Sequence, residues 1–159
     1  MHFYKKATKI QSITYAEALD EALCFGWIDG QAKPFDEKSW LQRYTPRRPK
    51  SIWSKRNIKY IDRLTKEGRM QPSGLQQVEA AKADGRWAQA YDGPSTMEVP
   101  KDFLEELSKH KEAEAFFNTF NKTNKYAISW RLQTAKKPET RLRRMNTIIE
   151  MLKKGEKFH

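Results

Sequence analysis

The segment at residues 45–50 (TPRRPK) constrains the fold of this chain more than any other stretch. Its two prolines lack a backbone N–H group and favour extended conformations in the residues before them, so no regular helix can run through it. Before this segment, short stretches alternate between apolar and polar residues; after it, apolar residues recur at helical spacing. We therefore expect a helix and strands on its N-terminal side and helices on its C-terminal side.

The first helix is expected over residues 14–25. Thr14 and Glu17 have the spacing of a capping box, in which a hydroxyl and a carboxylate accept hydrogen bonds from otherwise unpaired amides at the helix start. Gly26 suits the position just after a helix end. The apolar residues between these signals share a broad face, which we expect to cover one side of a small sheet.

Short strands are expected at residues 27–30 and 39–45, and a third at residues 2–6. In the second of these, alternate residues from Trp40 to Tyr44 share one side, which is the period of a half-buried strand. The connecting residues KPFDEK contain turn chemistry. These segments predict an antiparallel sheet of two or three strands.

Helix start and stop signals mark the remaining elements: a proline or a serine cap begins a helix, and a glycine ends one. We expect further helices from Ser51 or Ser54 to Gly68, from Pro72 to Gly85, over residues 101–109, 111–120 and 124–134, and from Pro138 to Lys154. The predicted fold class is mainly α (α+β), with a small antiparallel sheet of two or three strands and covering helices, followed by an all-helical C-terminal subdomain.

Residues 86–99 contain an Asp-Gly-Pro sequence and are typical of a linker. We place a boundary there. Residues 1–92 are expected to form an N-terminal α+β part and residues 93–159 a C-terminal helical subdomain, unless the two pack as one compact unit.

The chain carries 31 Lys and Arg against 20 Asp and Glu, a formal charge of +11, and the excess lies in two blocks. Residues 41–69 hold 10 basic and 2 acidic side chains, and residues 131–159 hold 9 and 3. If the fold brings the blocks together, they form a basic face that attracts phosphates or nucleic acid. The alternative is that both are solvated helix faces. The candidates for nucleic-acid contacts are Lys55, Arg56, Arg141 and Arg144.

Several classes of protein are disfavoured by composition. One cysteine, Cys24, cannot form an internal disulfide, and three scattered histidines lack the spacing of a metal site, so no metal or cofactor is expected. No apolar run approaches the ~18 residues of a membrane span, and the N-terminus lacks the apolar core of a secretory signal. We expect a cytoplasmic protein. Common nucleotide-binding and hydrolase motifs are missing, which weakens the case for an enzyme.

The main candidate site is the basic segment around Trp53, just before an expected helix start. Free amides at a helix start and nearby guanidinium groups bind oxyanions, and an indole offers a stacking surface. The residues expected to bind an anionic small molecule are Trp27, Asp29, Arg43, Arg47, Arg48, Trp53, Ser54 and Asn57. The alternative is that Trp53 packs in the core and the arginines bond to loop carbonyl groups.

Asp29 is the only catalytic candidate. It lies between Trp27 and Gly30, where a carboxylate beside an indole could serve as a general acid or base, grouped with Arg43 and Trp53. The alternative is a turn in which the Asp29 side chain bonds local amides. Because no second carboxylate stands at motif spacing, we favour a non-enzymatic binding protein, and an enzyme stays an alternative.

Four stretches resemble one bacterial family: ALCFGWIDG at residues 22–30, RYTPRRPKSIWSKRNI at 43–58, GRMQPSGL at 68–75 and AKKPETRLRRMNTIIEMLKKG at 135–155. Together they look like the YdeI/OmpD-associated family, also labelled bacteriocin-protection-like. The label implies a link with resistance to cationic antimicrobial peptides through an outer-membrane porin, and it implies no reaction. A chain of charge +11 repels cationic peptides, so the label says little about mechanism.

Relatives in this family usually carry a few dozen residues before the segment that corresponds to FYKK at residues 3–6. Without them, Phe3 and Tyr4 are expected to be exposed on the sheet, or covered by a second copy of the chain. Exposed aromatic patches are common dimer surfaces, so a homodimer is among the expected partners.

Overall fold

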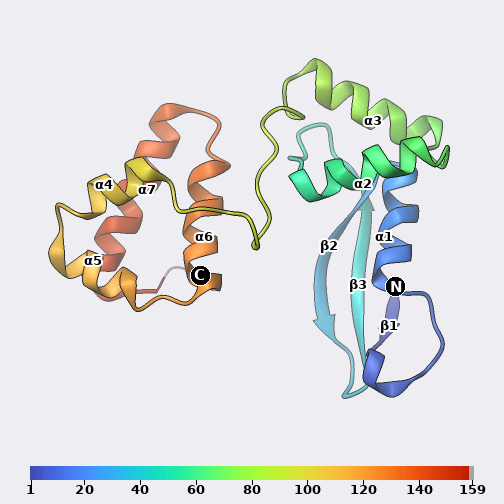
Figure 1. Ribbon diagram of the computed structural model, residues 1–159, viewed down its shortest axis with the longest axis horizontal. Coiled ribbons are helices and arrows are strands. Elements are labelled where there is room, and N and C mark those ends of the chain that lie inside the picture. The colour runs from blue at the N-terminus through green and yellow to red at the C-terminus, as the bar shows by residue number, and fades with distance from the viewer. Residues whose placement is uncertain (158–159) are drawn as a thin grey trace. The chain divides into compact units, whose positions relative to one another are not determined.

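The computed structural model describes residues 1–157 of the 159-residue chain. It divides into two compact units, Met1–Ala90 and Tyr91–His159, called unit 1 and unit 2 below. Unit 1 contains a small sheet with helices, and unit 2 contains helices and no strand within the described residues (Figure 1). This confirms the mainly helical α+β fold that the sequence predicts.

Three strands form the sheet of unit 1: β1 (His2–Tyr4), β2 (Trp27–Pro34) and β3 (Ser39–Pro46). Their order is β1-β3-β2, and both pairings are antiparallel. All three expected strands are present. β2 runs further than residues 27–30, with a β-bulge on the way, so the β2–β3 hairpin is longer than its sequence pattern indicates.

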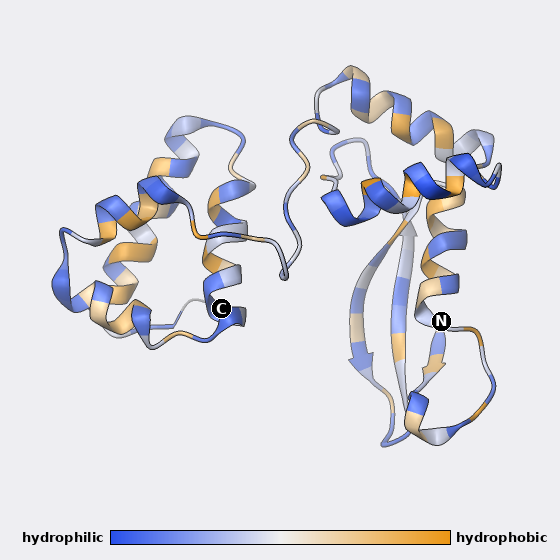
Figure 2. Cartoon of the chain, viewed as in Figure 1, coloured by the Kyte–Doolittle hydropathy of each residue, from blue (hydrophilic) through white to orange (hydrophobic). Residues whose placement is uncertain are grey.

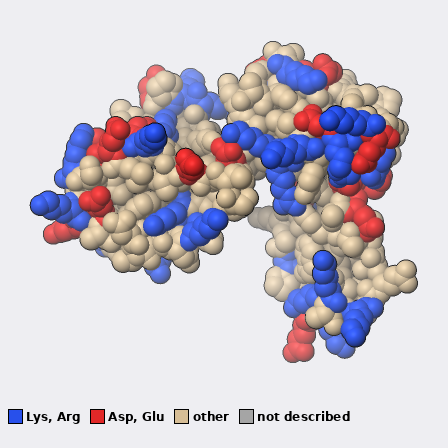
Figure 3. Space-filling view, in the orientation of Figure 1, with Lys and Arg blue, Asp and Glu red and all other residues tan. Residues whose placement is uncertain are grey.

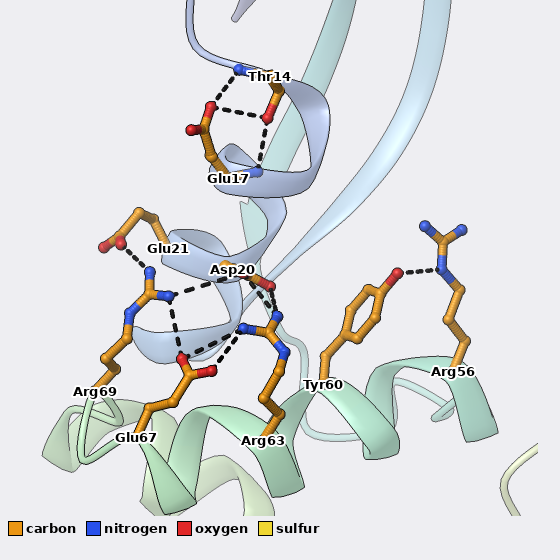
Figure 4. A network of polar contacts seen from close by, with 9 residues as sticks. All are labelled: Thr14, Glu17, Asp20, Glu21, Arg56, Tyr60, Arg63, Glu67 and Arg69. Atoms are coloured by element: carbon orange, nitrogen blue, oxygen red, sulfur yellow. Dashed lines mark hydrogen bonds and ion pairs between the residues drawn. The ribbon is translucent and has the colours of Figure 1, made fainter.

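α1 (Tyr15–Cys24) begins at a complete capping box. The Glu17 amide donates to the Thr14 hydroxyl at 3.2 Å, and the Thr14 amide donates to the Glu17 carboxylate at 2.7 Å (Figure 4). The helix ends before Gly26, whose φ of 78° lies in the left-handed region that favours glycine. A 3₁₀ turn, η1 (Lys6–Thr8), lies between β1 and this helix. Both ends of α1 lie where the sequence predicts them.

The side of the sheet that faces α1, called the closed face, is filled by aromatic residues. Phe3 lies opposite Trp40 in the register, and their rings stack 4.8 Å apart. The Tyr15 ring of α1 lies 5.9 Å from Trp40. Phe3 is therefore only 2% exposed, and the expectation that it is exposed is wrong. Tyr4, whose side chain alternates to the other side, is exposed as expected.

α2 (Lys55–Lys66) and α3 (Pro72–Ala83) complete unit 1. Ser54, and not Ser51, caps α2, while α3 starts with its proline in the first turn. The core of unit 1 consists of Leu19, Leu23, Cys24, Trp53, Ile61, Leu64, Val78, Ala81 and Ala90.

α3 touches the end of α1 at one very close contact. A Cβ atom on Gly74 would lie 2.1 Å from the Cys24 carbonyl oxygen, which no side chain permits. Cys24 is itself buried, and burial raises the pKa of its thiol. The glycine thus lets the two helices meet, and the thiol lies inside the core that they share.

The helices of unit 2 are α4 (Lys101–Leu107), α5 (Lys111–Asn118), α6 (Lys122–Gln133) and α7 (Pro138–Lys153), and all four were expected. Figure 2 shows hydrophobic residues on the sides of these helices that face one another. Phe103, Leu107, Phe117, Ile128, Leu132, Ile148 and Leu152 form the centre of this core. No helix within the described residues is long and apolar enough to cross a membrane.

Candidate functional site

The Trp53 ring, expected as one wall of an anion pocket, lies in the core of unit 1. Trp87 packs on it with ring centroids 4.9 Å apart, and the Arg47 guanidinium carbon lies 3.4 Å from the Trp53 ring centroid. Arg47 is 6% exposed and donates a hydrogen bond to the Ile52 carbonyl at 3.2 Å. This cation–π contact holds the loop after β3 against the core, so the Trp53 ring and the Arg47 guanidinium both stabilise unit 1.

Ser54 and Asn57 are buried at the start of α2. The Asn57 amide donates to the Ser54 hydroxyl at 3.1 Å, which is a helix cap. Arg48, by contrast, has an exposed side chain, while its amide donates to the Ser51 hydroxyl at 3.0 Å. The four buried members of the expected pocket therefore close the loop and the helix start, and Arg48 alone remains at the surface there.

Asp29 faces α1, whereas Arg43 lies on the other side of the sheet. The Tyr15 hydroxyl donates to the Asp29 carboxylate at 2.6 Å, and burial together with this bond raises the pKa of Tyr15. Burial and the charge of Asp29 raise the pKa of Tyr44, which lies opposite it, to about 12. The structure thus bonds Asp29 to the Tyr15 phenol and places it near the Tyr44 phenol, and it does not bring together Asp29, Arg43 and Trp53.

A second group of rings lies on the opposite side of the sheet, called the open face. His2, Tyr4 and Phe35 form this aromatic cluster, with His2 5.0 Å from Tyr4 and 4.9 Å from Phe35 between ring centroids. Phe35 is 62% exposed and Tyr4 37%. Ser39 of β3, opposite Tyr4 in the register, is fully buried and leaves room for the larger side chains.

Two cations lie on the open face. Lys33 is opposite Leu41 in the register, and Arg43 is two residues along β3 from Leu41, so both share the side of His2 and Tyr4. Neither makes an ion pair or a side-chain hydrogen bond within residues 1–157. Figure 3 shows Lys and Arg atoms gathered at the hairpin end of the sheet as well as over α2.

At the hairpin end, one carboxylate is hydrogen-bonded within its own turn. Asp36 accepts hydrogen bonds from the Ser39 hydroxyl at 2.6 Å and from the Lys38 amide at 2.8 Å, and the first of these holds the pKa of Asp36 below its usual range. Lys5 donates to the Glu37 carbonyl at 2.8 Å. This end of the sheet therefore carries both signs of charge, whereas the charged side chains Lys33 and Arg43 of the open face are both basic.

Several cations of the first basic block are neutralised within unit 1 (Figure 4). Arg63 binds both carboxylate oxygens of Asp20 at 2.6 and 2.7 Å, and Arg69 binds Glu21 at 2.5 Å. Glu67 pairs with both arginines. The candidates Lys55 and Arg56 open α2, and Arg56 donates to the Tyr60 hydroxyl at 3.1 Å. Part of the charge of this block therefore holds α1 to α2.

The two nucleic-acid candidates of the second block are engaged inside unit 2. Arg141 binds the Asp102 carboxylate at 2.6 Å, and Arg144 donates to the Arg131 carbonyl at 2.7 Å. The blocks fall in different units, so a shared basic face stays a prediction. The last two residues of the second block, Phe158 and His159, lie outside the described residues.

Sequence reasoning missed the aromatic cluster. Phe35 stands in the KPFDEK connection, whose composition predicts only a turn, and the short strand that holds His2 and Tyr4 offers little alternation. The signal that could have found it is an aromatic residue beside lysine at a hairpin end. Within the described residues, no group of three or more His, Cys, Asp or Glu is placed to hold a metal ion.

Comparison with family models gives two matches. Residues 1–77 match a family described as a domain of unknown function (DUF8412). Residues 96–155 match the family described as bacteriocin-protection, YdeI or OmpD-associated. Of the stretches that carry the resemblance, only residues 135–155 lie in the second match. Comparisons with curated proteins and with solved structures give no match. The chain therefore contains, at residues 96–155, a domain of the YdeI/OmpD-associated bacteriocin-protection family.

Proposed function

We propose that unit 1 is a non-enzymatic binding module, and that it binds single-stranded nucleic acid on the open face of the sheet. One observation carries this proposal: Tyr4 and Phe35 present exposed rings on the side of the sheet that also bears Lys33 and Arg43. Bases stack on such rings whatever their sequence, and neighbouring cations contact the phosphates between them.

An extended polyanion suits these residues better than a small anion does. The residues of the expected anion pocket are engaged in packing, since Arg47, Trp53 and Asn57 are buried. Lys33 and Arg43, in contrast, are exposed along a sheet surface. A strand that runs along this surface contacts both cations and both rings, whereas a small anion reaches few of them. The carboxylates at the hairpin end disfavour phosphates there, which directs the strand toward Arg43.

Fluorescence anisotropy of a labelled oligo-dT of about 15 nucleotides, a length within the usual site sizes, tests the proposal. The double variant Tyr4→Ala/Phe35→Ala should bind at least about tenfold more weakly, because each stacked base contributes ~1–3 kcal/mol. The matched control is Phe25→Ala, which removes a ring that is 51% exposed but lies beside α1. This control should bind like the unaltered chain.

Equal affinity of the double variant and the control would contradict the proposal, as would an affinity that does not fall with salt. Inorganic phosphate serves as competitor for the other interpretation. If millimolar phosphate displaces the oligonucleotide at constant ionic strength, a small-anion site is favoured instead.

A further inference from the structure

Unit 2 contains a pocket of about 500 Å³, formed by the irregular segment before α4, the end of α6 and the first turn of α7. Small-molecule sites in proteins usually have volumes of ~300–1,000 Å³, so this pocket has room for a small ligand. Its apolar lining residues are Met97, Val99, Pro100, Leu132 and Ala135. They form an apolar wall, on which part of a ligand can pack away from water.

The segment before α4 is held in place at both ends by polar bridges. At its start, the Asp92 amide donates to the Gln133 side-chain oxygen at 3.1 Å, and the Gln133 side-chain nitrogen donates to the Asp92 carboxylate at 2.8 Å. Just beyond its end, Arg141 donates to both carboxylate oxygens of Asp102 at 2.6 and 2.7 Å. The wall that this segment forms is therefore built before a ligand binds, as is usual for small-molecule sites.

The pocket lining carries both signs of charge and no net charge. It contains two basic residues, Lys101 and Arg141, and two acidic residues, Asp92 and Glu98. Asp92 and Arg141 take part in the bridges. Lys101 and Glu98 have exposed side chains, and neither makes an ion pair or a side-chain hydrogen bond within residues 1–157. One cation and one carboxylate therefore remain for a ligand beside the same apolar wall.

A ligand with a single sign of charge fits this pocket less well than one with both signs. A phosphate or a simple carboxylate that Lys101 attracts is also repelled by Glu98, and Arg141 is already paired with an acidic residue. A simple cation meets the opposite conflict. A molecule that carries both charges meets neither, because each of its charges has an oppositely charged partner on the protein.

We infer that this pocket binds a small zwitterion with an apolar side chain, which is the chemistry of a free apolar amino acid or of a short apolar peptide. Its carboxylate pairs with Lys101, its ammonium group pairs with Glu98, and its side chain packs on the apolar wall. The two charge-assisted bonds fix the orientation of the ligand, and the wall favours apolar over polar side chains. The site belongs to unit 2, so it is independent of the oligonucleotide proposed for the open face of unit 1.

Isothermal titration calorimetry of the full chain with L-leucine and with L-leucyl-L-leucine tests the inference and distinguishes the two sources of this chemistry. At least one of these zwitterions should bind with a saturable heat. Binding of L-leucine assigns the site to an amino acid, and binding of the dipeptide alone assigns it to a peptide. No saturation by either zwitterion at millimolar concentrations would overturn the inference.

Two modified forms of the zwitterion that binds serve as matched ligands. The N-acetylated form lacks the ammonium charge and the C-amidated form lacks the carboxylate charge. Each should bind at least about tenfold more weakly than the zwitterion, because one charged residue of the pocket is then left without its partner. Equal affinity for either modified form would overturn the inference.

Two variants then show which residue recognises which charge. Lys101→Gln should abolish the preference over the amidated form, and Glu98→Gln should abolish the preference over the acetylated form. Lys111→Gln, which alters an exposed lysine of α5, is the matched control and should keep both preferences. Each preference is a ratio of two affinities of one variant, so a general loss of stability leaves it unchanged. Survival of either preference in its own variant would overturn the inference.

Discussion

The two faces of the unit 1 sheet use aromatic residues in opposite ways. On the closed face, Phe3 is 2% exposed and stacks on Trp40. One residue along the same strand, Tyr4 is 37% exposed on the open face. A three-residue strand thus gives one ring to the core and one to the surface. The alternation of side chains along the strand, rather than residue type, therefore decides whether a ring stabilises the fold or is available to a ligand.

Removing each ring in turn tests whether the two faces differ in their contribution to stability. Phe3→Ala should lower the free energy of unfolding by about 3–5 kcal/mol, because it leaves a cavity between Trp40 and Tyr15. Tyr4→Ala should cost less than about 1 kcal/mol, since its ring is partly solvated. Urea denaturation measures both. Equal losses would show that the faces are energetically alike.

Alkaline pH tests the two phenols of the closed face. Tyr44 has its pKa raised from 10.0 to about 12, and the pKa of Tyr15 is raised as well. A pKa that is higher in the folded state favours the protonated phenol there, so this stabilisation is complete below pH 10 and is lost as the pH rises through 12. The unaltered chain should lose about 1–2 kcal/mol more than Tyr44→Phe over this interval. Parallel profiles in pH-dependent denaturation would refute the expectation.

The smallest change in the free energy of unfolding is expected for a substitution on the open face. Arg43→Gln should change the free energy of unfolding by less than about 0.5 kcal/mol, because its side chain is exposed. The slope of log K against log salt for the oligonucleotide should become shallower by about 0.7, the value for one phosphate contact on a single strand. Lys66→Gln, on the exposed side of α2, is the charge-matched control and should leave the slope unchanged. A change of slope with Lys66→Gln would place the strand elsewhere.

The ends of the elements were predictable because each is decided by chemistry within a few residues. Thr14 and Glu17 form their capping box without help from the rest of the fold. Pro72 and Pro138 begin helices in which their missing N–H would be unpaired in any case. Gly26 ends α1 in a conformation that other residues avoid. Such local agreement explains why the order of elements matched its expectation.

The candidate site was less predictable because burial depends on distant partners. The basic run before α2 has the pattern of a solvated loop, yet Arg47 is buried against Trp53, whose other neighbour, Trp87, is far away in sequence. The prediction that Phe3 is exposed was wrong for the same reason, since only the register with Trp40 shows where the Phe3 ring lies. Pattern alone states that a residue is aromatic or charged, not which side of the sheet it occupies.

The buried thiol of Cys24 gives unit 1 a built-in reporter of its own opening. The chain contains one cysteine, and the contact between its carbonyl and Gly74 holds α3 over this end of α1. A thiol reagent can modify Cys24 only in molecules whose core has transiently opened, so the ratio of its rate to that in denaturant measures the opening equilibrium. Unit 2 contributes no thiol to this signal. Labelling kinetics would therefore report the local stability of one half of the chain while the other half remains attached.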